Sequence, residues 1–237
     1  MKIRPSLRQL CALMSLPLLA CSSGADERAP SADWSGLPAP YDSGVTATVP
    51  LDDNVVMVIR GDRARRYAPD GGFFSDDEIS LPYHVNAALP VGDNQVIFFV
   101  DEAAQLVDLS TGDAIQTLAL IEGGLPRDWY GVDAAAVIEA GRWLLISGDE
   151  YVYYMSPVEP DDQVVVSEVM SLSDVGWPTW TDGVDAAANI DGSSLVLFRG
   201  DMTMTVDLND GSAGQPKPFG VRAPELKPSH PQYPISN

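Results

Sequence analysis

Cysteine and histidine, the residues most often used for catalysis and metal binding, are scarce in this sequence. The chain contains Cys11, Cys21, His84 and His230. A serine–histidine–acid triad would have to be built on His84, and no nucleophile motif lies beside it. Haem held by both histidines would need them to meet across the iron, and no pattern brings them together. We therefore predict no nucleophilic catalysis, no histidine–cysteine zinc site and no bound haem.

Paired carboxylates are the remaining feature that suits catalysis. Asp76 and Asp77 are adjacent, as are Asp161 and Asp162. Glycoside hydrolysis needs two carboxylates at a set separation, which the fold decides rather than the spacing in sequence. A hydrolase using these carboxylates is the less favoured alternative, because acids in loops between repeats are more simply solvated charges. We predict that the protein is not an enzyme.

A cluster of arginines is the clearest local charge feature. Arg60, Arg63, Arg65 and Arg66 stand close together in an otherwise acidic chain. If the segment is a strand, Arg63 and Arg65 point to one face and Arg66 to the other. One interpretation is a site for an anion or an acidic partner. The favoured interpretation is an exposed edge whose charges discourage aggregation and offset nearby carboxylates.

These arginines lie in a segment of about 25 residues that the chain repeats four times. The repeats begin at Val45, Val85, Val132 and Val184. Two residues later each repeat has an alanine: Ala47, Ala87, Ala134 and Ala186. Each also has an apolar block further on: Val56 to Arg60, Val96 to Val100, Trp143 to Ser147 and Leu195 to Arg199.

The chemistry of one repeat predicts three or four short strands. An unbroken apolar block is typical of a strand buried on both faces. The block is followed by Gly-Asp, or by Asp-Glu in the second repeat, which indicates a hairpin turn. The small residues at the start of each repeat predict strands that converge on an axis with no room for large side chains. Such units are blades of a β-propeller, so we predict an all-β fold with four blades.

The repeats resemble those of the hemopexin-like four-bladed propeller, found in hemopexin, matrix metalloproteinase C-terminal domains and certain seed albumins. The third and fourth copies carry the resemblance most specifically, as VDAAAVI and VDAAANI, whereas the second reads VNAALPV and the first VTATVPL. The resemblance covers roughly Leu37 to Gly211, and we place the propeller at residues 44–211. That family usually closes its ring with a disulfide. No cysteine pair can do so here, so we expect non-covalent closure.

The resemblance also implies an ion site at the residues that follow the valines, here called the axial residues: Thr46, Asn86, Asp133 and Asp185. In the family, backbone carbonyls at these positions ring the central tunnel and hold a calcium or sodium ion. Oxygen ligands of this kind are what calcium requires. Thr46 and Asn86 remove two carboxylates and should weaken the site. The alternative is that the axial side chains bond the inner strands and water fills the tunnel.

The N-terminal residues have the pattern of an export signal. Three basic residues precede an apolar stretch from Gln9 to Ala20, which at about 12 residues is too short to span a bilayer. Residues 1–20 are therefore predicted to be a signal peptide. Leu18 to Cys21 resembles the bacterial lipobox, in which the cysteine is acylated, for example with palmitate. Ser22 rather than aspartate follows the cysteine, so the outer membrane is favoured if the cell has two membranes. The alternative to a lipoprotein is an ordinary signal peptide.

The flanks differ from the repeats in composition. Residues 21–43 are rich in Ser, Gly, Ala, Asp and Pro and are predicted to be a flexible tether. Residues 212–237 form a proline-rich tail, in which Phe219 to Arg222 is a candidate outermost strand. Trp129, Trp177 and Trp180 precede the third and fourth repeats; they are predicted to wedge between blades, with a surface contact patch as the alternative.

The formal net charge of −20 restricts the partners. A surface this acidic repels nucleic acid and anionic headgroups. We expect a monomeric, membrane-anchored module that binds a protein or a small cationic ligand. A polyamine is a candidate because a seed albumin of the resembled family binds one. The alternative of a different class is a purely structural component of the cell envelope.

Overall fold

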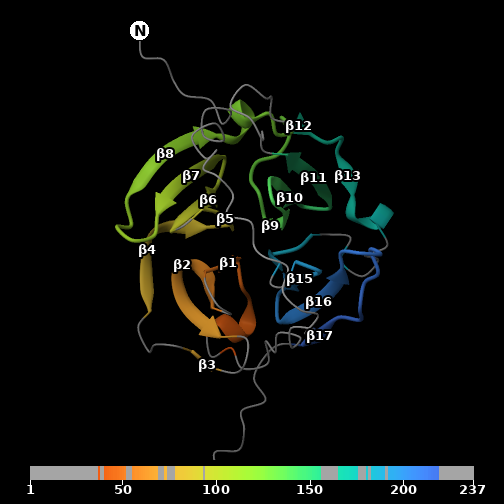
Figure 1. Cartoon of the computed structure of the whole chain (residues 1–237), viewed down its shortest axis with the longest axis horizontal. Coiled ribbons are helices and arrows are strands. Elements are labelled where there is room, and N and C mark those ends of the chain that lie inside the picture. Colours follow the sequence, from red (N-terminus) through yellow and green to blue (C-terminus); the bar gives the residue numbers. More distant parts are fainter. Residues whose placement is uncertain are drawn as a thin grey trace, which may run out of the picture.

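The computed structural model describes residues 37, 40–51, 55–68, 72–73, 78–92, 94–155, 165–175, 180, 183–189 and 192–218. The predicted signal peptide, Cys21, Trp177, His230 and both acid pairs lie outside these residues. Within them, the chain forms four antiparallel sheets arranged in a ring, each built around one repeat (Figure 1). The structure is therefore a four-bladed β-propeller, as the repeats predict.

Each blade combines one repeat with the strand or strands that follow it. Blade 1 contains β1 (Ala47–Pro50), β2 (Val56–Ala68), β3 (Gly72–Phe73) and β4 (Ile79–Val85). Blade 2 contains β5 (Ala87–Gly92), β6 (Gln95–Val100), β7 (Ala103–Asp108) and β8 (Ala114–Ala119). Blade 3 contains β9 (Ala134–Glu139), β10 (Arg142–Ser147), β11 (Glu150–Met155), β12 (Val165–Val166) and β13 (Met170–Ser171). Blade 4 contains β14 (Ala186–Asn189), β15 (Ser194–Arg199), β16 (Met202–Asp207) and β17 (Lys217–Pro218).

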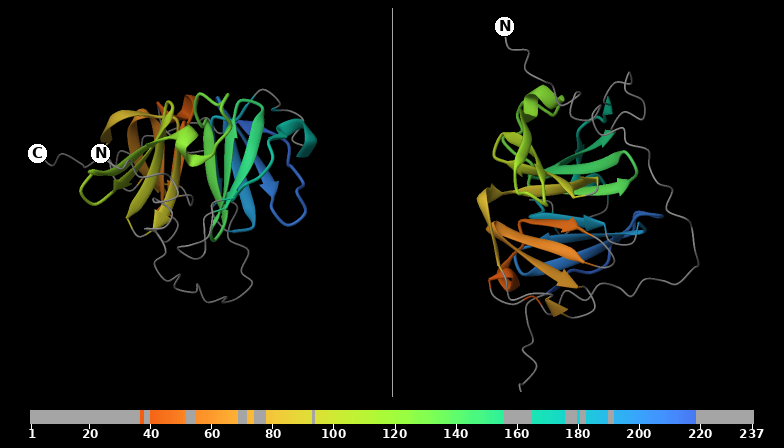
Figure 2. Two further views of the ribbon diagram at one scale, coloured as in Figure 1. Left: turned by 90° about the horizontal axis from the view of Figure 1, so that it is seen from above. Right: turned by 60° about the vertical axis from the view of Figure 1, so that its left-hand side comes forward.

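Short 3-10 helices accompany three of the blades in the described part of the chain. They are η1 (Tyr41–Ser43) before blade 1, η2 (Leu120–Gly123) after β8 and η3 (Leu172–Val175) after β13. Figure 2 shows the ring from two further directions, with the sheets packed against one another around the axis.

The alanine-containing strands lie innermost, as expected. β1 contacts β5, β5 contacts β9, β9 contacts β14, and β14 contacts β1, so the inner strands close a ring. The alanines that begin these strands, Ala47, Ala87, Ala134 and Ala186, are at most 2% exposed. Side chains larger than alanine would hold the four backbones apart at this point, so the small residues permit the ring.

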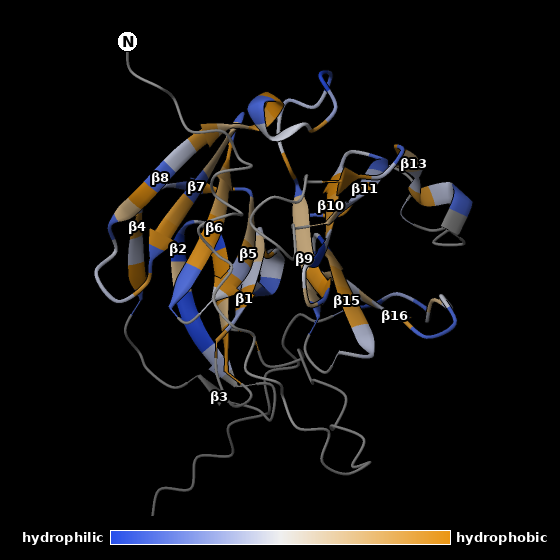
Figure 3. Cartoon of the chain, turned by 45° about the horizontal axis from the view of Figure 1, so that its top comes forward, coloured by the Kyte–Doolittle hydropathy of each residue, from blue (hydrophilic) through white to orange (hydrophobic). Residues whose placement is uncertain are grey.

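The core is divided among the interfaces between neighbouring blades. Ile97 and Phe99 of β6 pack toward blade 3, whereas Val96 and Phe98 pack toward blade 1. Alternate side chains of one strand thus enter different clusters, because they point to opposite faces of the sheet. Both faces are buried, which explains the unbroken apolar blocks; β10 and β15 stand out accordingly as hydrophobic strands in Figure 3.

The ring closes between blades 4 and 1 without a covalent link. Val56, Val58 and Tyr67 of β2 share one buried cluster with Ala186 of β14 and Phe198 of β15. A hydrogen bond adds to the apolar contact, because the Thr48 hydroxyl donates to the Ala187 carbonyl at 2.9 Å. Burial of apolar surface therefore performs the role that the resembled family gives to a disulfide.

The flanking segments take more part in the fold than their composition suggests. Leu37 and Tyr41, within the predicted tether 21–43, are fully buried in the closing cluster. In the predicted tail, Ala213 bridges to Val206, and Lys217–Pro218 forms β17 against β16. The candidate strand at Phe219 to Arg222 lies outside the described residues.

Candidate functional site

The structure gathers the four axial residues at one end of the central axis. Thr46, Asn86, Asp133 and Asp185 line a common cavity of about 480 Å³. Its wall also includes Arg60, His84 and Arg199. The mouth of the tunnel therefore combines two carboxylates with two guanidinium groups, an arrangement that spacing along the sequence does not reveal.

Three axial side chains hold the hairpin turn of their own blade. Asp133 Oδ2 accepts a hydrogen bond from the Gly148 N–H at 2.7 Å, and Asp185 Oδ2 accepts one from the Gly200 N–H at 2.6 Å. In blade 1 the hydroxyl of Thr46 accepts from the Gly61 N–H at 3.0 Å. We call this contact the turn lock. These bonds join the axial side chains to the glycine that follows the apolar strand, rather than to the inner strands named in the sequence-based alternative.

Asn86 of blade 2 is the exception. Its Oδ1 is buried and has no hydrogen-bond partner within the described part of the chain. The residue at the turn is Asp101, with φ 49°, where the other blades have glycine. A buried amide oxygen without a donor is costly, so the site favours a bound donor or cation.

A cation at the axial residues would have to be bound by oxygen atoms. The backbone N–H groups of all four donate to the apolar strand of their own blade, as in the 2.8 Å bond from Asp133 to the Ile146 carbonyl. No group of three or more acidic, histidine or cysteine side chains gathers for a metal in the described residues. Any ion there would depend on carbonyl and amide oxygens more than on carboxylates.

The opposite end of the axis is apolar. A cavity of about 370 Å³ is lined there mainly by the inner strands, including Ala88, Ala135, Ala187 and Ala188. The two ends of the axis therefore differ: the tunnel mouth is lined by two carboxylates and two guanidinium groups, whereas the described lining of the other end is mainly aliphatic and includes the single charged residue Glu139.

The arginine cluster is split by the structure. The Arg60 guanidinium donates to the Pro40 carbonyl and to the Ser43 hydroxyl, and so binds η1 against blade 1. Arg63 and Arg65 pair with Glu78, at 3.2 and 3.7 Å. Arg66 is exposed. These pairs offset the charge of Glu78, but β2 pairs here with β4, so Arg63 and Arg65 do not lie on the outer edge that the favoured interpretation expected.

The described histidine packs over a glycine, and the two described tryptophans are buried between blades. The ring of His84 lies over Gly61, where a Cβ would come within 2.8 Å of its Cε1 atom. Trp129 is 7% exposed between blades 2 and 3, and Trp180 is 5% exposed between blades 3 and 4. The Trp129 indole donates to Glu150 Oε2 at 2.9 Å. Both tryptophans wedge between blades, as predicted.

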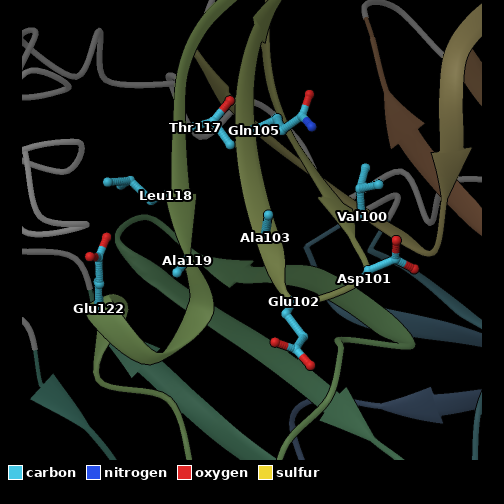
Figure 4. A pocket seen from close by; sticks show the side chains of 9 residues that line it. All are labelled: Val100, Asp101, Glu102, Ala103, Gln105, Thr117, Leu118, Ala119 and Glu122. Atoms are coloured by element: carbon cyan, nitrogen blue, oxygen red, sulfur yellow. The ribbon is translucent and has the colours of Figure 1, made fainter. Parts of the chain in front are cut away.

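A second polar cavity lies on blade 2, and no motif pointed to it. It has a volume of about 630 Å³ and is bordered by the turn between β6 and β7, the first half of β7, the second half of β8 and Glu122 of η2 (Figure 4). Three exposed acids surround it, Asp101, Glu102 and Glu122, which we call the acidic rim. Their carboxylates are spread along the rim in Figure 4 rather than directed at one point.

The distribution of charge along the sequence marks this region, although no motif does. No lysine or arginine occurs between Arg66 and Arg127, a range that includes the whole of blade 2. The acidic rim is therefore not neutralised by basic residues of its own blade. Spread carboxylates suit a ligand with several separated cationic groups better than a metal ion, which needs converging oxygens.

Comparison with solved structures identifies the architecture. The hemopexin fold protein CP4 from cow pea superimposes with a TM-score of 0.63, covering 76% of this chain and 94% of that chain at 14% identity. The chain has the hemopexin fold. The 2S albumin seed protein from Dolichos gives a TM-score of 0.59 at 14% identity. The match covers 73% of this hemopexin-fold chain and 93% of the albumin chain. A plant lectin with two metal binding sites from Cicer arietinum gives 0.57 at 16% identity, covering 73% and 92%.

Sequence comparison adds no closer relationship, since no protein-family model and no curated protein matches the chain. These three structural neighbours are a hemopexin-fold protein, a seed albumin and a lectin, none of which is described as an enzyme. At these identities the likeness concerns the fold alone. Among the described residues, no helix combines the length and apolar character required to cross a membrane.

Proposed function

We propose that this hemopexin-fold propeller is a non-catalytic binding module, anchored to a membrane through Cys21, and that the acidic rim of blade 2 binds cationic groups. The observation that carries the proposal is the cavity of about 630 Å³ surrounded by Asp101, Glu102 and Glu122. Its volume lies within the range of small-ligand sites. The net charge of −20 attracts cations toward it over longer distances.

A linear polyamine is the ligand class that this rim suits. Its ammonium groups are separated by alkyl chains, so that each can approach a different carboxylate, and Ala103, Ala119 and Leu118 supply apolar surface for the alkyl segments. Exposed ion pairs are weak individually and are screened by salt. Binding should therefore be moderate and should weaken steeply as salt increases.

Titration calorimetry of the full-length chain with spermidine tests the rim. The double variant Glu102→Gln and Glu122→Gln should lose most of the binding heat. Its matched control, Glu168→Gln and Asp201→Asn, removes the same charge from exposed sites on other blades and should bind as the parent does. Equal loss in both variants would mean that net charge alone attracts the ligand, and the rim would not be a site.

The tunnel mouth is a separate proposal for a calcium or sodium ion. The carbonyls of Thr46, Asn86, Asp133 and Asp185 would hold it, and the unpartnered Oδ1 of Asn86 is the observation in its favour. A bound ion would supply positive charge that fixes the inner strands. The midpoint temperature of thermal unfolding should then rise with added calcium, and it should rise less in Asn86→Ala. No shift with either ion would leave the axial residues with the turn lock as their role.

The membrane anchor is tested independently of ligand binding. Processing of the full chain should be sensitive to globomycin, and Cys21→Ala should remain unacylated and be released from the membrane fraction. An acyl-free parent protein would indicate an ordinary signal peptide.

A purely structural envelope role is the second candidate function, since a propeller can also space or cap an assembly. Because the acidic rim is exposed, a structural role predicts no ligand or partner whose binding depends on Glu102 and Glu122. Crosslinking in whole cells, followed by comparison of the parent with the Glu102→Gln and Glu122→Gln variant, separates the two roles.

A further inference from the structure

The outermost strands of the four blades differ in how well they resist pairing with another chain. In blade 1, β4 contains Pro82 and its pairing with β2 shifts register. In blade 3 the edge is divided between the two-residue strands β12 and β13, and in blade 4 it is the dipeptide Lys217–Pro218. Short strands, proline and lysine are the features by which natural sheets prevent further strands from adding.

The outer edge of blade 2 is a longer strand without proline or lysine, and the one register shift in its pairing with β7, between Leu106 and Val107, lies away from Thr117 and Ala119. β8 reads Ala-Ile-Gln-Thr-Leu-Ala, is six residues long, and contains neither proline nor a charged side chain. It pairs with β7 on one side, and no described strand pairs with the other. Ile115 on this strand is 52% exposed. Within the described structure, β8 is therefore the edge most open to strand addition.

The backbone groups that face outward can be assigned from the register. Leu120 N–H donates to the Glu102 carbonyl at 2.9 Å, and Ala119 lies opposite Ala103. Hydrogen-bonded and non-hydrogen-bonded pairs alternate along an antiparallel ladder. The N–H and C=O of Thr117 and Ala119 therefore point away from β7, in the direction from which an added strand would approach.

Charge at the ends of β8 defines the partner. Asp113 precedes the strand, and Glu102 and Glu122 of the acidic rim lie beyond its other end, all exposed. A second copy of this chain would bring the same acids close together, with −20 of formal charge on each molecule. A segment with an uncharged centre and basic residues at both ends meets complementary charge instead.

We propose that β8 binds an extended, basic-flanked segment of a partner protein as an added strand of blade 2. Backbone hydrogen bonds to Thr117 and Ala119 provide the affinity, and lysine or arginine near the ends of the segment reach Asp113 and the acidic rim. Thr117 and Ala119 also line the blade 2 cavity, so the added strand borders it. The inference rests on the proposed function, because it uses the same rim, but it adds the strand edge as a separate requirement.

The edge is tested by fluorescence anisotropy of the full-length chain with a labelled peptide of alternating threonine and valine that carries two lysines at each end. Thr117→Pro removes an outward N–H without removing a bond to β7, and should weaken peptide binding by about tenfold or more. Thr117→Ala keeps that N–H and should bind as the parent does. Unchanged near-ultraviolet circular dichroism and thermal unfolding show that Thr117→Pro remains folded.

Spermidine separates failure of the edge from failure of the rim. Thr117→Pro keeps all three carboxylates of the acidic rim, so it should weaken spermidine binding much less than peptide binding, whereas Glu102→Gln with Glu122→Gln should weaken both ligands. Peptide binding that is equal in Thr117→Pro and Thr117→Ala would overturn the strand addition while leaving the rim intact. A concentration-dependent dimer in sedimentation that Thr117→Pro abolishes would also overturn the proposal, because the occupant of the edge would then be a second copy.

Discussion

Blades 2 and 4 come from the same repeat but differ at the tunnel mouth and at the outer edge. In blade 4, Asp185 locks the turn at Gly200, and the edge ends in Lys217–Pro218. In blade 2, Asn86 makes no such lock and Asp101 replaces glycine at the turn. The buried parts of the two blades remain alike, since an apolar strand and an alanine-containing strand are needed to build any blade.

This difference shows which parts of the repeat are required by the ring and which are not. Residues that face a neighbouring blade are constrained in every copy, because each interface must be filled. The turn lock and the outer edge affect only their own blade. Blade 2 departs from the repeat at both places and also carries the acidic rim. Departures from a repeated local pattern are expected at functional sites.

The largest expected loss of stability comes from emptying the interface between each of these two blades and the next blade in the ring. Phe198 is fully buried between blades 4 and 1, and Phe99 is 3% exposed between blades 2 and 3. Truncation to alanine leaves a cavity, so Phe198→Ala and Phe99→Ala should each cost about 3 to 5 kcal/mol of unfolding free energy. Urea unfolding measures this loss.

The two variants should differ in local opening, because blades 4 and 1 close the ring without a direct chain connection. Amide hydrogen exchange should accelerate in β1 and β14 of Phe198→Ala more than in β5 and β9 of Phe99→Ala. Similar exchange in both variants would contradict the view that the closing interface is the most readily opened one.

A second prediction concerns alkaline pH at the closing interface. Burial, followed by the nearby Glu78 carboxylate, raises the pKa of Tyr41 to about 12 from its ordinary value of 10.0. The unfolded chain ionises first, so the contribution of Tyr41 to the unfolding free energy is constant below pH 10 and falls as pH rises toward 12, by roughly 1 to 2 kcal/mol. Chemical unfolding at several pH values should show this decrease.

Tyr41→Phe provides the control, because phenylalanine has no titrating group and should flatten part of the alkaline decrease. Burial also raises the pKa of Tyr83 and Tyr151, so some pH dependence should persist. An identical alkaline profile for Tyr41→Phe and the parent would show that Tyr41 is not responsible.

The fold could be predicted from the sequence because each repeat combines local signals that agree. Alanine after each starting valine indicates a crowded axis, and apolar blocks such as Leu195 to Arg199 indicate strands buried on both faces. The paired glycines at Gly148 and Gly200 indicate the turns. Four agreeing copies then determine the number of blades, even where the first copy, with Thr46 and Thr48, departs from the pattern.

The candidate sites were less accessible to sequence analysis because they depend on distances between elements. Glu102 and Glu122 are separated by the whole of β7 and β8, and only the fold places both beside one cavity. Arg199 reaches the tunnel mouth from blade 4, far along the chain from Arg60. The open edge of β8 is visible only by comparison with the other three outer strands.

A smaller effect tests the turn lock itself. Asp185→Ala removes the acceptor of the 2.6 Å bond from the Gly200 N–H and should cost about 1 kcal/mol, the low end for a charge-assisted bond because the site is exposed. Asn86→Ala removes an amide oxygen that has no described partner, and should cost close to nothing or stabilise slightly. Thermal unfolding in the presence of a chelator makes the comparison without bound calcium. A larger loss for Asn86→Ala would mean that blade 2 has a lock of another kind.

The smallest expected effect concerns backbone conformation at the same two turns. Gly200 has φ 54° and Asp101 has φ 49°, so both occupy the left-handed region that glycine tolerates best. No atom lies within 4 Å of a Cβ added at Gly200, so Gly200→Ala should cost about 1 kcal/mol through backbone strain alone. Asp101→Gly should stabilise blade 2 by a few tenths of a kcal/mol, less than the alanine penalty because aspartate tolerates this region better than alanine. If Asp101→Gly were instead destabilising under chemical denaturation, the Asp101 side chain would be supporting its turn, and blade 2 would be no less constrained than blade 4.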